Sequence, residues 1–338
     1  MQVLAGDIGG TKTLLAIAEV EFSGAAQAAP RIALTEQRRY DSRAFPGLAA
    51  VCRRYAEELG RGLPRRAGFG VAGPVKNGRS QTTNLPWVLD EVDLALALGA
   101  HRVRLINDFG ALALGIPAVS GRDLATLNVG LRDPLGPTAV IGAGTGLGEA
   151  TTITAAGRRR ILSSEGGHAS FSPRSELEIG ILRFLTARHG HVSWERLLSG
   201  EGLVNVTEAL GQTTGLPLPP ALANQIATQR SEAPALVTEQ ARAGDPLCKR
   251  ALEVFCTLYG AEAGNLALKT LATGGVYIAG GIAPRILAEL QDGRFREAFL
   301  DKGRMRPLLE QMPVQVLLDD TAALLGAALL AAQDDDFP

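Results

Sequence analysis

A carboxylate stands in an unusual place in the segment RLINDFGALALG, residues 104–115. Two apolar residues, Leu105 and Ile106, lead directly into Asn107 and Asp108, and an alanine- and leucine-rich helix is predicted to follow. A carboxylate at the end of an apolar strand is costly to desolvate unless something holds it or requires it. The local sequence leaves open whether Asp108 is a helix N-cap or a functional group.

The segment GDIGGTKT, residues 6–13, resembles a phosphate-binding loop without matching one. The P-loop needs glycine directly before its Lys-Ser/Thr pair, where this chain has Thr11, and a second strand follows rather than a helix. A tight glycine hairpin carrying Asp7 and Lys12 remains. Its backbone N–H groups can bind phosphate oxygens, and Asp7 can hold Mg²⁺ through water. A plain β-turn with an Asx contact is the alternative.

Two further glycine clusters follow apolar strands. IGAGTGLGEA, residues 141–150, has a glycine at every second position, unlike the dinucleotide G-x-G-x-x-G spacing. This density around Thr145 indicates that the backbone approaches a bulky anion closely. GGVYIAGGI, residues 274–282, places Gly280 and Gly281 where an adenine or ribose can lie against bare backbone. The three clusters together predict a nucleotide site.

The segment SSEGGHASFSP pairs a carboxylate with an imidazole. Glu165 and His168 are separated by two glycines, which permit a sharp turn that points both side chains at one ligand. Such a pair can bracket adjacent sugar hydroxyls, which donate to one group and accept from the other. A metal pair or a structural hydrogen bond is the alternative, although zinc would need further ligands with suitable spacing.

A third polar segment, RHGHVSWER at residues 188–196, is less informative. His189 and His191 have the spacing of a His-x-His metal pair. Glu195 lies early in a predicted helix, where a carboxylate complements the helix dipole. The local sequence therefore leaves the function of Glu195 undecided.

The elements that must position these residues alternate between strands and helices. The order predicts an α/β fold with helices covering mixed sheets. Two strand–glycine–strand units more than a hundred residues apart indicate a duplicated core with two lobes and a ligand cleft between them. The expected strands are 2–9, 13–22, 31–40, 67–73, 102–108, 138–144, 147–157, 158–164, 274–282 and 314–320; the expected helices are 45–60, 88–99, 175–190, 193–211, those within 233–272, and 321–333; residues 213–222 are the expected exposed loop.

Composition excludes several classes of partner. The 338 residues carry a formal net charge of −1, which gives no electrostatic case for a nucleic-acid or membrane partner. The three cysteines form no C-x-x-C pair and suit a reducing cytoplasm. The longest apolar run, 321–332, is too short to span a bilayer, and the first residues do not match a signal peptide. We therefore expect a soluble cytoplasmic protein.

Taken in order, the motifs resemble the bacterial glucokinase family, the hexokinase-like branch of the sugar kinase, Hsp70 and actin superfamily. The resemblance covers nearly the whole chain. The related ROK branch shares the DIGGTK start but carries a cysteine-rich zinc motif after its Glu-x-Gly-His, which this chain lacks. The motifs are GDIGGTKT, INDF, GAGTGLG, EGGH, GHVSWERLLSGEGLVN, GNLAL, GGVYIAGGI and DDTAALLGAALL.

The resemblance implies a two-lobed actin-like ATPase fold of the ribonuclease H-like type. Residues 1–107 and 321–338 would form a small lobe, and 108–320 a large lobe with helical insertions. It also implies a cytoplasmic glycolytic enzyme, a homodimer, that uses ATP and Mg²⁺ to phosphorylate the 6-hydroxyl of D-glucose. Closure of the lobes on the sugar would exclude water. A kinase for another hexose (mannose, fructose or an N-acetyl sugar) or a non-enzymatic sugar sensor is the alternative.

The resemblance also assigns the site residues and makes Asp108 the general base. Lys12 and Leu14 depart from the family, which often has Asn and Arg there, and Asn84 in TTNLPW matches a substrate-side loop only weakly. No protein metal-ligand set is implied. The glucose-contacting residues are Asn107, Asp108, Glu165, His168 and Glu195; the nucleotide-binding residues are Gly6, Asp7, Ile8, Gly9, Gly10, Thr11, Gly142, Gly144, Thr145, Gly146, Gly280 and Gly281.

Overall fold

The fold was taken from a computed structural model, which describes residues 1–22, 30–82, 85–155 and 158–333. Asn84 and the acidic end of the chain lie outside the described residues. The chain forms two compact units. The first comprises Met1–Asp123, Ala150–Ser163 and Asp319–Pro338, and the second comprises Leu124–Glu149 and Ser164–Leu318.

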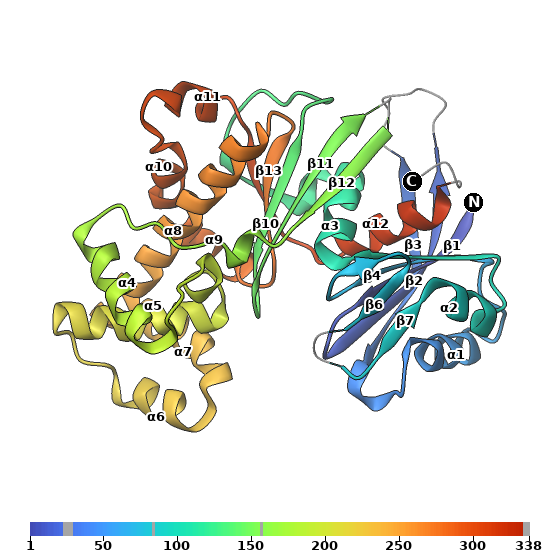
Figure 1. The fold of residues 1–338 in the computed structure, drawn as a ribbon, viewed down its shortest axis with the longest axis horizontal. Helices are drawn as coiled ribbons and strands as arrows, with labels where there is room; N and C mark the ends of the chain where they lie inside the picture. Colours follow the sequence, from blue (N-terminus) through green and yellow to red (C-terminus); the bar gives the residue numbers. More distant parts are fainter. Residues whose placement is uncertain (23–29, 83–84, 156–157, 334–338) are drawn as a thin grey trace. The chain divides into compact units, whose positions relative to one another are not determined.

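A five-stranded mixed sheet forms the centre of the first unit (Figure 1). Its strands are β1 (Gln2–Ile8), β2 (Lys12–Glu21), β3 (Arg31–Asp41), β4 (Arg66–Val71) and β8 (Arg102–Asn107). They lie in the order β3-β2-β1-β4-β8, with β1 antiparallel to β2 and parallel to β4, and β4 parallel to β8. The carboxyl ends of three parallel strands therefore meet at one edge, which carries Asp7 and Asn107.

Both faces of this sheet are covered by helices, because its central strands are apolar on both sides. Leu4 and Ile8 pack with the helices on one face, and Val3 and Ala5 with those on the other. Successive residues point to opposite faces, so one strand serves two cores. The helices are α1 (Leu48–Leu59) and α2 (Glu91–Leu98) on the first face, and α3 (Asp108–Gly115) and α12 (Ala322–Ala332) on the second (Figure 1).

Helices α3 and α12 lie in very close contact, which sets the unit boundary. A Cβ on Gly115 would lie 1.9 Å from the Ala322 carbonyl oxygen, and one on Gly326 would lie 1.7 Å from that of Ala111. Because α3 packs on α12, it belongs to the first unit. The boundaries thus differ from the expected 1–107 with 321–338, and the first unit also takes in residues 150–163.

The second sheet repeats the strand order of the first. Its strands are β9 (Leu124–Asn128), β10 (Thr138–Ala143), β11 (Leu147–Ala155), β12 (Arg158–Ser164), β13 (Gly275–Ala279) and β14 (Val314–Leu317), in the order β12-β11-β10-β13-β14-β9. Counted from β10, the order is third, second, first, fourth, fifth, as in the first sheet. The expected duplication of the core is confirmed, and β9 adds an antiparallel edge strand.

Most of the second unit is helical (Figure 1). Its longest helix contacts β10 and β13, and the Asp245 carboxylate caps it by accepting from Cys248 N at 2.8 Å. The expected helical region 233–272 divides at Gly244, whose φ of 97° breaks the helix. The helices are α4 (Glu176–His189), α5 (Gly200–Thr214), α6 (Pro220–Gln229), α7 (Ala233–Arg242), α8 (Pro246–Thr270), α9 (Leu287–Leu290), α10 (Arg294–Leu300) and α11 (Arg306–Glu310), with 3-10 turns η4 (Gly166–His168), η5 (Trp194–Arg196) and η6 (Arg230–Glu232).

Two sequence predictions of element type were too simple. Residues 88–90, expected in a helix, form β7 (Val88–Asp90) of a small sheet with β5 (Val75–Lys76) and β6 (Arg79–Gln81). Asp90 is extended and its side chain accepts from Val92 N and Asp93 N, so α2 begins only after it. The expected loop 213–222 is shorter, because α5 runs to Thr214 and α6 begins at Pro220. Among the described helices, none combines the length and apolarity needed to span a membrane.

Candidate active site

The turn between β1 and β2 is fixed by one serine. Gly9 N donates to the Lys12 carbonyl at 2.9 Å, which closes the turn. The Ser42 hydroxyl donates to the Gly9 carbonyl at 2.8 Å, and Ser42 N donates to the Thr11 carbonyl at 3.0 Å. The same hydroxyl lies 2.9 Å from the Thr13 hydroxyl. With its carbonyls bonded behind it, this turn is preorganised as a phosphate-binding hairpin would be.

Two of the predicted nucleotide-binding residues in this segment have packing roles. A Cβ on Gly6 would lie 2.6 Å from the Phe69 ring and 2.8 Å from Leu15, so glycine is needed for packing within the sheet. The Ile8 side chain is fully buried in the apolar core beneath the sheet. Only their backbones are left for a ligand, whereas Gly9, Gly10 and Thr11 are at least partly accessible.

Negative charge is in excess at the end of β1. Burial and, after it, the negative charge of Asp108 raise the pKa of Asp7 to about 7, and Lys12 opposes the rise. Lys12 Nζ lies 2.9 Å from Asp320 Oδ2, and this contact holds the pKa of Asp320 below its usual range. Lys12, whose role the sequence left open, is therefore an ion-pair partner for Asp320. The negative charge around Asp7 is therefore not fully neutralised, which favours a bound cation there.

The raised pKa of Asp7 predicts a pH-dependent stability. The folded state binds this proton more tightly than the unfolded chain, so the stabilisation is complete below pH 4 and is lost as pH rises through about 7. In EDTA, we expect the wild type to lose about 2 kcal/mol more apparent unfolding free energy between pH 4.5 and 8 than Asp7→Asn. Urea unfolding at both pH values measures this, with exposed Asp93→Asn as control. Equal losses in wild type and Asp7→Asn would show that Asp7 titrates normally.

The sequence left open whether Asp108 is the N-cap of the helix that follows it, but the N-cap is Asn107. Asn107 is the N-cap of α3, because its Oδ1 accepts from Phe109 N at 3.0 Å and Gly110 N at 3.2 Å. Its Nδ2 donates to the Gly73 carbonyl at 3.2 Å. Asp108 is the first helical residue, and its Oδ1 accepts from Phe109 N at 2.9 Å. The cap is thus Asn107, and the Asp108 carboxylate sits beside the helix N-terminus and the charge of Asp7.

The glycine turn after β10 is held against the start of α5. Gly144 N donates to the Gly146 carbonyl at 2.8 Å, which makes the turn tight, and Thr145 is exposed at its tip. Gly200 N, the first amide of α5, donates to the Gly144 carbonyl at 2.8 Å. The positive end of a fifteen-residue helix therefore adjoins this turn, which favours an anion there. No local pattern in the sequence indicates this contribution, because α5 begins more than fifty residues after the turn.

The turn after β13 rests directly on β10. Gly280 has a φ of 82°, and a Cβ on it would lie 2.3 Å from the Ala143 carbonyl oxygen. Ile282 N donates to that carbonyl at 3.3 Å, and Gly281 is exposed beside it. Two glycine turns that lie far apart in sequence are thus adjacent, as a shared nucleotide site requires.

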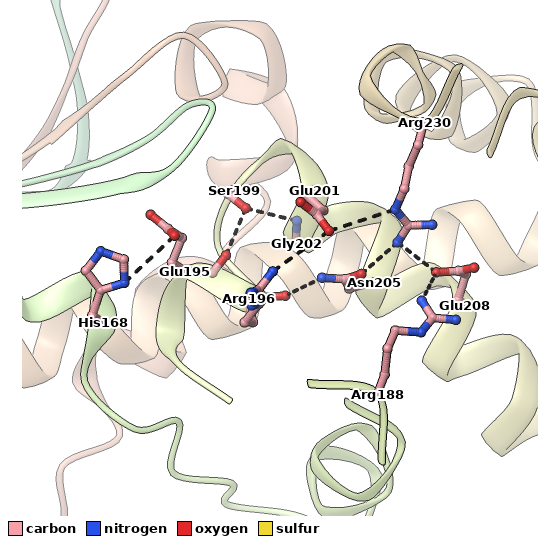
Figure 2. A network of polar contacts seen from close by, with 10 residues as sticks. All are labelled: His168, Arg188, Glu195, Arg196, Ser199, Glu201, Gly202, Asn205, Glu208 and Arg230. Atoms are coloured by element: carbon pink, nitrogen blue, oxygen red, sulfur yellow. Dashed lines mark hydrogen bonds and ion pairs between the residues drawn. The ribbon is translucent and has the colours of Figure 1, made fainter. Parts of the chain in front are cut away.

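Glu165, His168 and Glu195 are brought together, and Figure 2 shows His168 facing Glu195. His168 lies between the two carboxylates, with Nε2 3.9 Å from Glu165 Oε2 and Nδ1 3.9 Å from Glu195 Oε1. The side chains of Glu165 and His168 are exposed, whereas Glu195 is about two-thirds covered. Glu195 Oε2 accepts from Leu147 N at 2.9 Å, at the end of the glycine turn. Glu195 therefore belongs to the polar trio and to the glycine turn.

Close approach to β11 explains the two glycines of the EGGH motif. A Cβ on Gly166 would lie 1.9 Å from Glu149 Oε2, and one on Gly167 would lie 2.2 Å from the Leu147 carbonyl oxygen. Larger residues would push His168 away from Glu195. Glu149 is itself buried, and its burial and the charge of Glu262 raise its pKa to about 7. No local pattern in the sequence indicated this carboxyl group beneath the turn.

A polar network supports the segment that carries Glu195 (Figure 2). The Ser199 hydroxyl donates to the Glu195 carbonyl at 2.8 Å, and Asn205 Nδ2 donates to the Arg196 carbonyl at 3.0 Å. Arg230 donates to Asn205 Oδ1 at 2.7 Å. These bonds hold the Glu195 and Arg196 carbonyls, which are the last two of η5. Glu195 is therefore positioned by the start of α5 and, through Asn205, by Arg230 of η6.

His189 and His191, which have the spacing of a His-x-His metal pair, lie in two different surroundings. His191 Nε2 lies 3.1 Å from the Ser170 hydroxyl, and burial lowers the pKa of His189. Within the described ranges, no three His, Cys, Asp or Glu residues are grouped as metal ligands.

Comparison with known proteins identifies the family. The family model described as glucokinase matches residues 4–334. This chain belongs to the glucokinase family. Glucokinase from Nostoc punctiforme is 40% identical over 98% of this chain and 99% of that protein.

Solved structures of glucokinases share the fold. A glucokinase from an Antarctic psychrotroph has a TM-score of 0.81 at 30% identity over 98% of both chains. A ROK family glucokinase from Streptomyces griseus, solved with glucose and AMPPNP, has a TM-score of 0.63 at 21% identity, over 99% of this chain and 100% of that one. The predicted family and two-lobed α/β fold of ATP-dependent sugar kinases are confirmed.

Proposed function

We propose that this chain transfers the γ-phosphoryl group of ATP to the 6-hydroxyl of D-glucose, with Asp108 as general base. The observation that carries the proposal is the position of Glu195. It forms the polar trio with Glu165 and His168, and it also accepts from Leu147 N at the end of the glycine turn. A sugar-binding group and a phosphate-binding group thus share one residue. Full-length similarity to proteins named glucokinase supports the choice of glucose.

The chemistry assigned to Asp108 is a single proton transfer. The 6-hydroxyl oxygen forms a bond to the γ-phosphorus, the bond from that phosphorus to the β,γ-bridging oxygen breaks, and ADP leaves with the electron pair. The hydroxyl proton passes to the Asp108 carboxylate. Phe109 N, which donates to Asp108 Oδ1, orients the carboxylate for this task.

The two glycine turns and the β1–β2 hairpin are assigned to ATP. Backbone amides of Gly10 and Thr11, and those of Thr145 and Gly146, would bind phosphate oxygens, whereas the Gly9 and Gly144 amides close their turns. Gly280 and Gly281 would lie against the adenosine. The closed hairpin and the adjacent start of α5 support this assignment.

The negatively charged groups at the end of β1 in the first unit are suited to bind Mg²⁺. Asp7 has a raised pKa beside Asp108 and needs a positive charge to ionise fully near neutral pH. We propose that Asp7 holds Mg²⁺ through water, together with the ATP phosphates. Bound there, Mg²⁺ would offset the charge of the phosphate oxygens.

Asn107, Glu165, His168 and Glu195 are assigned to the remaining sugar hydroxyls. His168→Ala removes one side of the Glu165–His168–Glu195 bracket, so the glucose KM is expected to rise about tenfold with kcat within about threefold. Steady-state kinetics at saturating ATP measure both constants, with His101→Ala as a surface histidine control. A glucose KM equal to that of the wild type would remove His168 from the sugar site.

A sugar panel tests the proposed substrate. Coupled assays of ADP release compare glucose with mannose, fructose and N-acetylglucosamine at equal concentrations. We expect the highest kcat/KM for glucose. A higher value for another hexose would keep Asp108 as base and reassign the hydroxyl contacts, whereas ADP release that no sugar stimulates would overturn the kinase.

We also propose that the enzyme is a cytoplasmic homodimer. Its cysteines, Cys52, Cys248 and Cys256, are unpaired and buried, which suits a reducing compartment that supplies ATP. The dimer rests on the family resemblance. Light scattering of the purified chain decides between a dimer and a monomer.

A further inference from the structure

A buried tyrosine hydroxyl joins the two strands that end in the glycine turns of the second unit. Tyr259 lies on α8 and is fully buried. Its ring is packed edge-on against Phe255 and Phe295, each with a centroid distance of 5.9 Å. These contacts fix the direction of the hydroxyl, which reaches β10 and β13.

The hydroxyl uses both of its hydrogen-bonding functions there. It accepts from Ala143 N at 3.0 Å, and it lies 3.2 Å from the Ala279 carbonyl and 3.3 Å from the Ile141 carbonyl as donor. Burial raises the pKa of Tyr259, so the hydroxyl stays protonated and keeps its donor. One side chain thus contacts the last residues of both strands.

These bonds occur where the two parallel strands separate. The pairing of β10 with β13 ends at Gly142 and Ala279, and Gly280 then turns away with its positive φ. Beyond that point the Tyr259 hydroxyl stands between Ala143 N, from which it accepts, and the Ala279 carbonyl of β13. An unpaired buried amide would destabilise the fold, and the tyrosine hydroxyl satisfies it. Strand separation of this kind makes ligand sites at the carboxyl ends of parallel strands.

We propose that Tyr259 is a positioning residue for the nucleotide: its hydroxyl fixes the spacing between the turn at 142–146 and the turn at 280–281. The inference rests on the proposed assignment of these turns to ATP. Ala143 couples the two turns, since its amide is bonded to Tyr259 and its carbonyl to Ile282 N. Loss of the hydroxyl should therefore disturb both halves of the nucleotide site and leave the sugar-binding side chains in place.

Tyr259→Phe tests this role, and Tyr55→Phe is its matched control. Tyr55 is equally buried, and its hydroxyl donates to the Glu36 carbonyl at 2.8 Å in the first unit. Both substitutions remove one buried hydroxyl and keep the ring. ADP affinity by calorimetry, the KM values for ATP and glucose, and Tm are measured for both variants and the wild type.

For Tyr259→Phe we expect ADP affinity to fall about tenfold and the ATP KM to rise in parallel, with the glucose KM within about twofold. Tyr55→Phe should lower Tm without changing ADP affinity. Para-aminophenylalanine at position 259, which can donate and accept, should restore most of the ADP affinity. Wild-type ADP affinity in Tyr259→Phe, or equal increases in both KM values, would overturn the positioning role.

Two measurements on the wild type keep the tests independent. If the wild type phosphorylates glucose and binds ADP, the proposed function stands whatever the variant does. If Tyr259→Phe does not fold, amide hydrogen exchange of the wild type decides. The Ala143 amide should exchange among the slowest in the second unit, and ADP should slow it further together with Gly280 to Ile282. An Ala143 amide that exchanges as fast as exposed turn amides would overturn the inference.

Discussion

Asp108→Asn will lower kcat by about three orders of magnitude and change the glucose KM by no more than about threefold. Asparagine keeps the shape of the side chain and a carbonyl oxygen that can accept from Phe109 N, as Asp108 Oδ1 does at 2.9 Å. It cannot take a proton from the sugar hydroxyl, and general base catalysis of this kind contributes about 10²–10⁴ in rate. Steady-state kinetics with a coupled ADP assay measure both constants.

The same substitution elsewhere separates chemistry from folding. Asp93→Asn makes an identical change in the first turn of α2, at an exposed position in the same unit. It should leave kcat and both KM values unchanged. Because Asn107 rather than Asp108 caps α3, Asp108→Asn should keep a Tm close to that of the wild type. A kcat within about tenfold of wild type would remove Asp108 as the base.

Asp108→Asn also removes a negative charge beside Asp7, so the pH dependence of stability provides a second test. The Asp108 carboxylate raises the pKa of Asp7, so Asp108→Asn should lower it toward its ordinary value. The extra loss of stability between pH 4.5 and 8 should therefore be smaller in Asp108→Asn than in the wild type. This readout depends on the position of the charge and not on turnover.

Local patterns in the sequence were sufficient for the strands of the first sheet and for the expectation that Glu165 and His168 lie close together. The strands of the first sheet alternate between two apolar faces, so their period and their glycine ends were visible without tertiary information. Glu165 and His168 were expected to lie together because the two glycines between them permit a sharp turn, and their side chains approach to 3.9 Å. The structure adds the reason for those glycines, which is the close approach of β11 at Leu147 and Glu149.

Contacts between distant segments could not be predicted in the same way. Lys12 pairs with Asp320, and Tyr259 bonds to Ala143, across intervals of 308 and 116 residues. A residue's neighbours in sequence give no sign of such contacts, because topology alone brings the groups together. The bounds of the first unit differ from the expected ones for the same reason, because α3 packs on α12 through glycine contacts that the local pattern does not contain.

Glycines in these segments have two different structural roles, which their spacing in the sequence does not distinguish. Gly6 was assigned to the nucleotide, yet the space for its missing side chain is filled by Phe69 and Leu15. A Cβ on Gly146, by contrast, would lie 2.4 Å from Glu195 Oε2, at the junction of the polar trio and the glycine turn. Both residues lie in glycine-rich segments at strand ends. Only the atoms around each glycine distinguish the packing role from the site role.

Glu195 offers the second large effect, because its two oxygens serve different partners. Oε1 faces His168, and Oε2 accepts from Leu147 N at the end of the glycine turn. Glu195→Gln keeps an oxygen for Leu147 N and loses the negative charge toward the sugar. Glu195→Ala loses both. The two variants therefore separate a sugar contact from support of the phosphate-binding turn.

For Glu195→Gln we expect the glucose KM to rise about 10–100-fold, with the ATP KM within about twofold of wild type. For Glu195→Ala the glucose KM should rise at least as much, and the ATP KM should rise about fivefold because the Leu147 amide loses its acceptor. Glu176→Gln, an exposed carboxylate in the first turn of α4, is the control and should change neither constant. If Glu195→Ala left the ATP KM at the value of Glu195→Gln, Glu195 would act on the sugar alone. The turn would then be held by the Gly200 amide of α5, which donates to Gly144.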